Sequence, residues 1–320
     1  MDPNFTETPA LIADIGGTNA RFALATADRR IHAERILSGA DYPDLIQAAT
    51  AYLSDLAQPR PRRAVMAVAT PVAGDWIQFT NSPWSFSTEA ARQALGLERL
   101  DIINDFTALA LALPLLDSHE RRAVGGGSAV KNAPIALLGA GTGLGVSGLV
   151  WSGHHWIPLQ AEGGHVTFSA IDEREWAVYQ VLRERFGHVS PERLLSGPGL
   201  VNIYTALAAI QGWRPETLMP ADITERALTG TCPHCAEVLE LFCGALGTAA
   251  SNLALTLGAL GGVYIGGGIV PRLGALFDRS QFRSRFEAKG RFSAYLAGIP
   301  TWVITAANPA FRGVAAALAR

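Results

Sequence analysis

One local pattern occurs twice in this chain: a short apolar run, a turn rich in glycine with a threonine, and a second apolar run. The first copy joins Leu11–Ile15 to Ala20–Ala25 through a Gly-Gly-Thr turn. The second joins Ile135–Leu138 to Leu144–Trp151 through a Gly-Ala-Gly-Thr-Gly turn. Short apolar runs on either side of a glycine turn are typical of β-hairpins. The repeat therefore predicts an α/β chain with duplicated architecture.

The rest of the chain alternates between strand-like and helix-like patterns. Strands are expected at 31–36, 64–69, 76–79, 100–103, 262–265 and 302–305. Helices are expected at 44–56, 88–95, 106–113, 172–186, 198–209, 224–228, 237–257 and 314–318. A chain of 320 residues exceeds the size at which one hydrophobic core usually stops growing. We therefore expect two domains that share a cleft.

Composition excludes several classes of protein. The formal net charge is −2 and no run of lysine and arginine occurs, so nucleic acid is not an expected partner. The apolar stretches are interrupted before the ~18 residues that a membrane helix needs, and the N-terminal segment lacks the pattern of a signal peptide. Three cysteines are too few for a disulfide framework. We expect a cytoplasmic protein that does not contact membranes.

The glycine turns are candidate phosphate-binding sites, because a residue without Cβ lets backbone N–H groups approach an anion closely. Asp14 ends a strand next to the first turn and could hold Mg²⁺ through water, while Thr18 adds a hydroxyl donor. An ordinary tight hairpin is the alternative. The second turn and a later one, Gly266-Gly267-Gly268, favour phosphate binding, because three glycine loops could converge on one nucleotide.

Two other nucleotide-binding motifs do not fit. Leu144 stands where a dinucleotide fingerprint beginning at Gly139 needs its third glycine, and Pro271 stands there for the turn at Gly266. Glu162 lies at the distance of a ribose-binding acid, but a return strand rather than a helix follows the turn. The G-K-[ST] signature of a P-loop is absent from the sequence.

Polar side chains at predicted element ends are the other candidates. Asp105 follows Asn104 at the end of a strand, where it could accept a hydroxyl proton or simply cap the next helix. Glu162 and His165 frame two glycines and could hold sugar hydroxyls, the alternative being a polar loop. Glu192 lies in the first turn of a predicted helix, where an acidic residue is favoured in any case.

Cys232-Pro233-His234-Cys235 has the composition of half a zinc site. A structural zinc site needs four ligands, and no second Cys/His pair with suitable spacing follows. Pro233 can instead mark the start of a helix. We therefore expect no zinc.

Together these motifs resemble the bacterial glucokinase family of the actin/hexokinase-like superfamily. The resemblance extends over nearly the whole chain. The segments that carry it are Ala13–Arg21, Ile103–Ala108, Gly139–Gly145, Glu162–Val166, Leu195–Asn202 and Gly261–Pro271. Sugar kinases of the repressor-related branch usually carry a Cys/His zinc cluster after a Glu-x-Gly-His motif. No cysteine lies near His165, which favours the dedicated glucokinase branch.

The resemblance implies a ribonuclease H-like, duplicated two-domain fold with a central cleft. The small α/β domain would comprise 1–114 plus 306–320 and the large α/β domain 115–305, with the active site between them. Family members are typically homodimers. The resemblance also implies the reaction ATP + D-glucose → ADP + glucose 6-phosphate, with Mg²⁺.

By the same resemblance, Asp105 would be the general base, and the sugar would be held by Asn104, Asp105, Glu162, His165 and Glu192. The residues implied for Mg·ATP are Ala13, Asp14, Ile15, Gly16, Gly17, Thr18, Gly141, Thr142, Gly143 and Gly267. The alternatives are a kinase of another hexose or of an N-acetylated amino sugar, and a sugar-sensing regulator of related fold. A regulator should carry an N-terminal helix-turn-helix, and only a short polar segment precedes the first strand.

Overall fold

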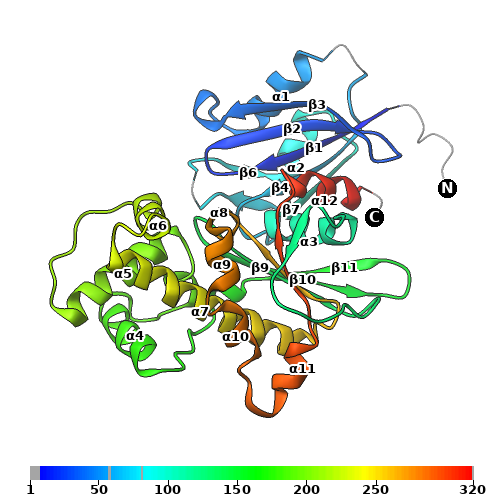
Figure 1. The fold of residues 1–320 in the computed structure, drawn as a ribbon. Helices are drawn as coiled ribbons and strands as arrows, with labels where there is room; N and C mark the ends of the chain where they lie inside the picture. Colours follow the sequence, from blue (N-terminus) through cyan, green and yellow to red (C-terminus); the bar gives the residue numbers. More distant parts are fainter. Residues whose placement is uncertain (1–7, 57–58, 81, 319–320) are drawn as a thin grey trace. The chain divides into compact units, whose positions relative to one another are not determined.

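The structure, a computed structural model, describes residues 8–56, 59–80 and 82–318 (Figure 1). It divides into two units. Unit 1 comprises Met1–Leu116 and Ala306–Arg320, and unit 2 comprises Asp117–Thr305. The sequence prediction placed these divisions after residues 114 and 305. The two units are described separately below.

Unit 1 is built on a five-stranded sheet with the order β3-β2-β1-β4-β7. Its strands are β1 (Ala10–Ile15), β2 (Asn19–Ala25), β3 (Ile31–Ser38), β4 (Arg63–Val68) and β7 (Arg99–Asn104). β1 and β2 form the antiparallel hairpin that the sequence predicts, and β3 extends it. β1, β4 and β7 run parallel, so their carboxyl ends meet at one edge of the sheet.

Helices cover both faces of this sheet. They are α1 (Leu45–Ser54), α2 (Thr88–Ala94), α3 (Asp105–Ala112) and α12 (Pro309–Ala317), and a small ribbon of β5 (Trp76–Gln78) and β6 (Ser85–Ser87) completes the unit. Leu11, Ala13 and Ile15 of β1 belong to a core that includes residues of α1 and α2, whereas Ile12 belongs to a second core with α3 and α12. This division follows from the alternation of side chains along a strand. The C-terminal helix thus packs in unit 1, against α3.

Unit 2 contains a six-stranded sheet with the order β11-β10-β9-β12-β13-β8. Its strands are β8 (Arg121–Ala123), β9 (Ile135–Ala140), β10 (Leu144–Trp151), β11 (Trp156–Ala161), β12 (Val263–Gly266) and β13 (Thr301–Ile304). β9 and β10 form the second predicted hairpin, and His154 and His155 lie at the tip of the next one. β9, β12 and β13 run parallel. The glycine turn after β9 and the one after β12 therefore lie at the same edge of the sheet.

The larger helices of unit 2 are α4 (Glu173–Phe186), α5 (Gly197–Gln211), α6 (Pro220–Leu228) and α7 (Pro233–Leu257). Helix α7 is long and apolar enough to cross a membrane, but 72% of its most apolar window is buried inside the protein. It is the central core helix of this unit. α6, α7 and α12 each begin earlier than predicted, at a proline, because proline suits the first turn of a helix.

Four short helices lie between β12 and β13, where the sequence analysis predicted none: α8 (Val270–Leu273), α9 (Ala275–Arg279), α10 (Phe282–Glu287) and α11 (Ser293–Ala297). Each has only four to six residues, too few to show a helical repeat. Phe277, Phe282 and Phe286 are fully buried and anchor this segment in the core of unit 2. Tertiary packing therefore holds these helices in place.

Candidate active site

The first glycine turn closes the hairpin of β1 and β2. The Gly16 N–H donates to the carbonyl of Asn19 at 2.9 Å, and the Gly39 N–H donates to the carbonyl of Thr18 at 2.8 Å. These bonds fix the turn from both sides. Ala13 and Ile15 are buried in the strand before it, whereas Gly17 and Thr18 are exposed at its tip. An exposed, rigid turn of this kind is able to present backbone and hydroxyl donors to an anion.

Asp14 lies opposite Arg21 in the hairpin register, and the two side chains form an ion pair with Arg21 Nη1 3.7 Å from Asp14 Oδ2. Burial raises the pKa of Asp14, and the positive charge of Arg21 opposes that rise. The Arg21 Nε is buried without a hydrogen-bond partner among the described residues. Asp14 therefore sits at the sheet edge with only part of its charge compensated.

Asn104 ends β7 and caps α3. Its Oδ1 accepts hydrogen bonds from the N–H groups of Phe106, at 2.9 Å, and Thr107, at 3.3 Å. Its Nδ2 donates to the carbonyl of Thr70 at 3.3 Å. The alternative that Asp105 is the cap of this helix is therefore wrong, because Asn104 occupies that position and Asp105 is the first helical residue.

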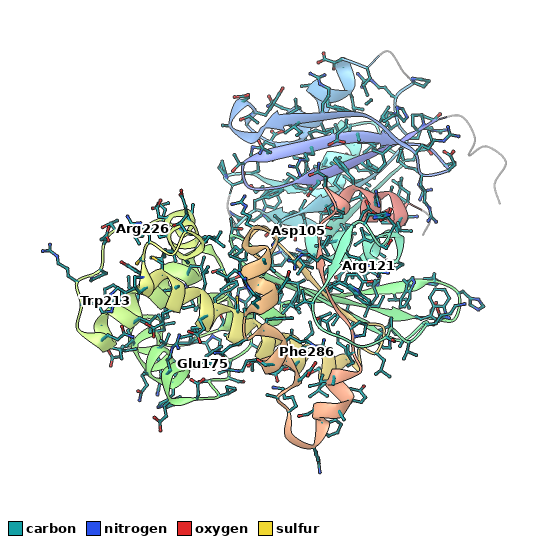
Figure 2. All side chains as sticks on the ribbon, in the orientation of Figure 1. Asp105, Arg121, Glu175, Trp213, Arg226 and Phe286 are labelled. Carbon is teal, nitrogen blue, oxygen red and sulfur yellow. The ribbon has the colours of Figure 1, made fainter. Side chains whose placement is uncertain are left out.

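Asp105 is the first residue of α3 and follows the end of β7 (Figure 2). Burial raises its pKa to about 6, the nearby charge of Asp14 adds to the rise, and a 2.8 Å hydrogen bond from the Phe106 N–H opposes it. Two carboxyl groups that destabilise each other's charge favour a proton or a cation nearby. A base with a pKa near 6 is suited to accept a proton close to neutral pH.

The second glycine turn joins β9 to β10 in unit 2. The Gly141 N–H donates to the Gly143 carbonyl at 2.8 Å, and the Gly197 N–H donates to the Gly141 carbonyl at 2.7 Å. The Leu144 N–H donates to Glu192 Oε2 at 2.9 Å. A Cβ on Gly143 would lie 2.5 Å from the same carboxylate oxygen, so a larger residue at this position would displace the Glu192 side chain.

The structure brings together the three predicted sugar-binding residues of unit 2. His165 Nδ1 lies 3.8 Å from Glu192 Oε1, and His165 Nε2 lies 3.9 Å from Glu162 Oε2. Glu162 and His165 are exposed, and Glu192 is half-buried, in a short 3-10 turn rather than an α-helix. Gly164, between them, packs so closely on Leu144 that a Cβ would lie 2.1 Å from its carbonyl oxygen. The cluster therefore presents two carboxylates, which accept hydrogen bonds, and one imidazole.

The third glycine turn abuts the second. Gly267 has φ +79°, and a Cβ at this residue would lie 2.2 Å from the carbonyl oxygen of Ala140, which ends β9. The Ile269 N–H donates to the same carbonyl at 3.2 Å. Unit 2 therefore places two of its glycine turns side by side. The hydrogen bond between Glu192 and the second turn was not predicted, because no local signal relates residues that lie 48 positions apart.

Metal ligands of the zinc type do not gather in the described part of the chain. No group of three or more His, Cys, Asp or Glu side chains there could hold a metal ion. A magnesium ion that is held mainly by phosphates and water needs fewer protein ligands. The half-buried, only partly compensated Asp14 fits such a role, since its carboxylate oxygens are the hard donors that Mg²⁺ prefers.

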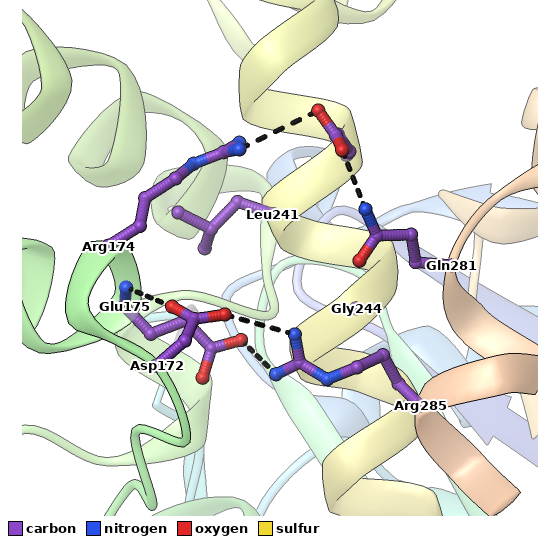
Figure 3. Close-up of a pocket in the computed structure, with 8 residues that line it drawn as sticks. Asp172, Arg174, Glu175, Leu241, Gly244, Gln281 and Arg285 are labelled. Atoms are coloured by element: carbon purple, nitrogen blue, oxygen red, sulfur yellow. Dashed lines mark hydrogen bonds and ion pairs between the residues drawn. The ribbon is translucent and has the colours of Figure 1, made fainter. Parts of the chain in front are cut away.

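A small cavity of about 30 Å³ lies elsewhere in unit 2, among α4, α7 and the segment before and within α10 (Figure 3). Arg285 pairs there with Asp172 and with the buried Glu175, and Gln281 donates to Glu240 at 2.7 Å. The charged side chains that line this cavity are thus paired with one another. This network joins three helices, and none of the predicted site residues belongs to it.

Comparison with known proteins agrees with this geometry. The family model for glucokinase matches residues 11–320. A glucokinase of Neisseria meningitidis is 53% identical over 310 residues, which cover 97% of this chain and 94% of that protein. The crystal structure of a glucokinase from an Antarctic psychrotroph has 40% sequence identity and a TM-score of 0.88, covering 97% of this chain and 98% of that one.

A longer relative also matches. The "Bifunctional protein glk" of Burkholderia thailandensis is 55% identical over 312 residues, which cover 97% of this chain. This chain spans 48% of the length of that relative. The family model matches residues 11–320, and each relative covers 97% of this chain. These matched ranges include the motifs described above. The chain therefore belongs to the glucokinase family.

Proposed function

We propose that this protein phosphorylates D-glucose at its 6-hydroxyl with ATP as the phosphate donor. The observation that carries the proposal is the position of Asp105: a half-buried carboxyl group with a pKa raised to about 6, at the carboxyl edge of a parallel sheet and near a second carboxyl group. Family membership supports the same reaction. A binding-only protein has no need for a base tuned in this way.

In this mechanism Asp105 accepts the proton of the 6-hydroxyl as its oxygen attacks the γ-phosphorus. The new O–P bond forms while the bond between that phosphorus and the β,γ-bridging oxygen breaks, and ADP leaves. The protein contributes mainly orientation and charge stabilisation, as in other phosphoryl transfers. The cap that Asn104 provides fixes the start of α3 and so positions Asp105.

The sugar hydroxyls are proposed to bind Glu162, His165 and Glu192, with Asn104 and Asp105. Two carboxylates within 4 Å of one imidazole form a set of acceptors and donors that suits adjacent hydroxyl groups. A sugar lacking or inverting one hydroxyl leaves one of these polar groups unpaired, which costs binding energy. The cluster therefore supports selection among hexoses.

The phosphates are proposed to lie against the glycine turns. The N–H groups of Ala13–Thr18 and Gly141–Gly143 that are not bonded within the turns would supply backbone donors, and Gly267 would lie beside the adenosine. Mg²⁺, when bound with ATP, neutralises charge on the phosphates, and Asp14 would hold it through water. We further propose that the protein acts in the cytoplasm as a homodimer, in keeping with its three free cysteines and its family.

A coupled assay with Mg²⁺, ATP and a panel of sugars tests this function. We expect ADP to form with glucose, at a higher kcat/KM than with other hexoses or with N-acetylated amino sugars. Faster turnover of one of those sugars would replace glucose as the substrate. No turnover of any sugar, in protein that is folded by circular dichroism, would overturn the proposal.

A further inference from the structure

The Cys-Pro-His-Cys motif lies at the start of α7 and includes none of the candidate site residues. Cys232 is the N-cap of this 25-residue helix, and Pro233 is its first residue. The Cys232 Sγ accepts a hydrogen bond from the Cys235 N–H at 3.4 Å. The first cysteine thus points back over the helix end toward the second.

The two cysteines are also close in space. The Cys232 Sγ lies 3.4 Å from the backbone nitrogen of the residue that carries the second thiol. Residues three positions apart at a helix end have Cβ atoms roughly 5–6 Å apart, and a disulfide needs a Cβ separation of about 3.5–4.5 Å. Closing the disulfide therefore requires a backbone shift of roughly 1–2 Å at the cap, where Cys232 has extended backbone angles and lies outside the regular helix.

The surroundings hold the motif in this arrangement. The ring of His234, between the cysteines, stacks on Trp213 with centroids 4.0 Å apart and planes 19° apart. The positive charge of Arg226, which pairs with Glu216 at 3.0 Å, lowers the pKa of Cys235 and so opposes the effect of burial. Trp213 and Arg226 both lie in the helical part of unit 2 (Figure 2). A pair of cysteines next to a cation at a helix N-terminus is the setting in which protein thiols react.

We propose that Cys232 and Cys235 form a redox-active dithiol that exchanges with low-molecular-weight disulfides of the glutathione class. In the first step Cys232 sulfur attacks one sulfur of the small disulfide. A mixed disulfide forms, and one small thiol leaves with the proton that Cys232 gave up. In the second step Cys235 sulfur attacks Cys232 Sγ, the protein disulfide forms, and the second small thiol leaves with the Cys235 proton. The protein dithiol is oxidised by two electrons and the small disulfide is reduced to two thiols.

Exposure sets the order of these steps. Cys232 is half-buried and can be reached from solvent, whereas Cys235 is fully buried. Burial raises the pKa of Cys235 to about 12, and its neighbour Cys232 adds to the rise, so Cys235 stays a thiol while Cys232 reacts. Cys243 is buried without a neighbouring cysteine and serves as an internal control.

The test uses the full chain, equilibrated without oxygen in buffers of graded oxidised and reduced glutathione. Acid quenching, alkylation and peptide mass spectrometry then report the state of each cysteine. We expect the peptide containing Cys232 and Cys235 to lose two hydrogen atoms as the oxidised share rises, and to regain them with excess reduced glutathione. Cys243 should stay free to alkylate throughout.

Three variants separate the steps. Cys235→Ala should stop at a glutathione adduct on Cys232, Cys232→Ser should form neither adduct nor disulfide, and Cys243→Ala should behave as the wild type does. Circular dichroism checks that each is folded. Two free thiols in the folded wild type at every buffer ratio would overturn the proposal. Oxidation that occurs only after the protein is unfolded in urea would also overturn it. Both outcomes are measured on the wild-type protein.

Discussion

The side chain of Glu192 accepts a hydrogen bond from the backbone N–H of Leu144, at the end of the second glycine turn. The other oxygen of the same carboxylate lies 3.8 Å from His165 Nδ1. One side chain therefore contacts both the proposed phosphate-binding turn and the proposed sugar-binding cluster. A substitution in the turn is therefore expected to change the affinity for glucose.

Gly143→Ala tests this relationship. The new Cβ would lie 2.5 Å from Glu192 Oε2, so the carboxylate must move and its bond to Leu144 is weakened. A hydrogen bond to a charged group contributes about 1.5–3 kcal/mol, so glucose affinity should fall roughly 10- to 100-fold, together with ATP affinity. Calorimetry with each ligand measures both effects.

Gly141→Ala is the matched control, because a Cβ there meets no atom within 4 Å. Folding and glucose affinity should be unchanged, while ATP affinity falls if phosphates approach this backbone. Unaltered glucose binding in folded Gly143→Ala protein would show that Glu192 does not bind the sugar in the arrangement described.

Asp105→Asn separates catalysis from folding. Asn104 caps α3, and an asparagine at 105 still has an oxygen that can accept from the Phe106 N–H. The amide cannot take a proton, so kcat should fall by roughly 10²–10⁴, the usual contribution of general-base catalysis. Steady-state kinetics and thermal melting on the same sample measure the two properties. A folded variant that turns over near the wild-type rate would remove Asp105 from the mechanism.

The raised pKa of Asp105 also predicts a pH dependence of stability. Because its pKa is about 6 in the folded state and about 3.9 unfolded, the unfolded state binds fewer protons between these values. The contribution of this group to the free energy of unfolding therefore falls as pH rises from about 4 to 6. Asp105→Asn should be more stable than the wild type at pH 7, by on the order of 2 kcal/mol, and the difference should shrink below about pH 4. Urea unfolding at several pH values measures it, and a variant less stable at pH 7 would contradict the assignment.

Catalysis should show the same ionisation. A base that must be a carboxylate loses activity when protonated, so kcat/KM for glucose should fall tenfold per pH unit below about 6. The residual activity of Asp105→Asn should not show this decrease below about pH 6. If the same decrease persists in the variant, the ionisation that causes it belongs to another group.

Sequence analysis could predict strands and candidate site residues where the local sequence carries a distinctive pattern. Glycine turns between apolar runs located both hairpins, and the polar ends of strands pointed to Asp14 and Asp105. The role of Asn104 as cap was missed because Asn and Asp have nearly equal preference for that position. The helices between residues 270 and 297 were missed because buried phenylalanines, rather than a helical repeat, hold them in place.

Specific long-range contacts could not be predicted from local sequence patterns. The bond between Glu192 and Leu144 and the packing of Gly267 on Ala140 depend on how distant segments fold together. The packing of α12 on α3 depends on such contacts too, although the family resemblance places the C-terminal segment in the small domain. These contacts are the ones that fix the site, and they need the structure.

Gly313 of α12 provides the last test, because it packs against the helix that carries Asp105. A Cβ at this position would lie 1.7 Å from the carbonyl oxygen of Ala108, in the first turn of α3. Replacing glycine by alanine inside a helix usually stabilises it by about 1 kcal/mol. Here the helices must separate, and overpacking of this kind costs about 1–3 kcal/mol or more. Gly313→Ala should therefore lower the free energy of unfolding in urea, whereas Gly126→Ala, whose Cβ meets no atom within 4 Å, should not. Because the displaced turn begins at Asp105, kcat should also fall in the folded fraction of Gly313→Ala. The pH near 6 at which kcat/KM decreases should shift as well. A Gly313→Ala protein as stable and as active as Gly126→Ala would mean that α12 does not press on α3 and does not position the base.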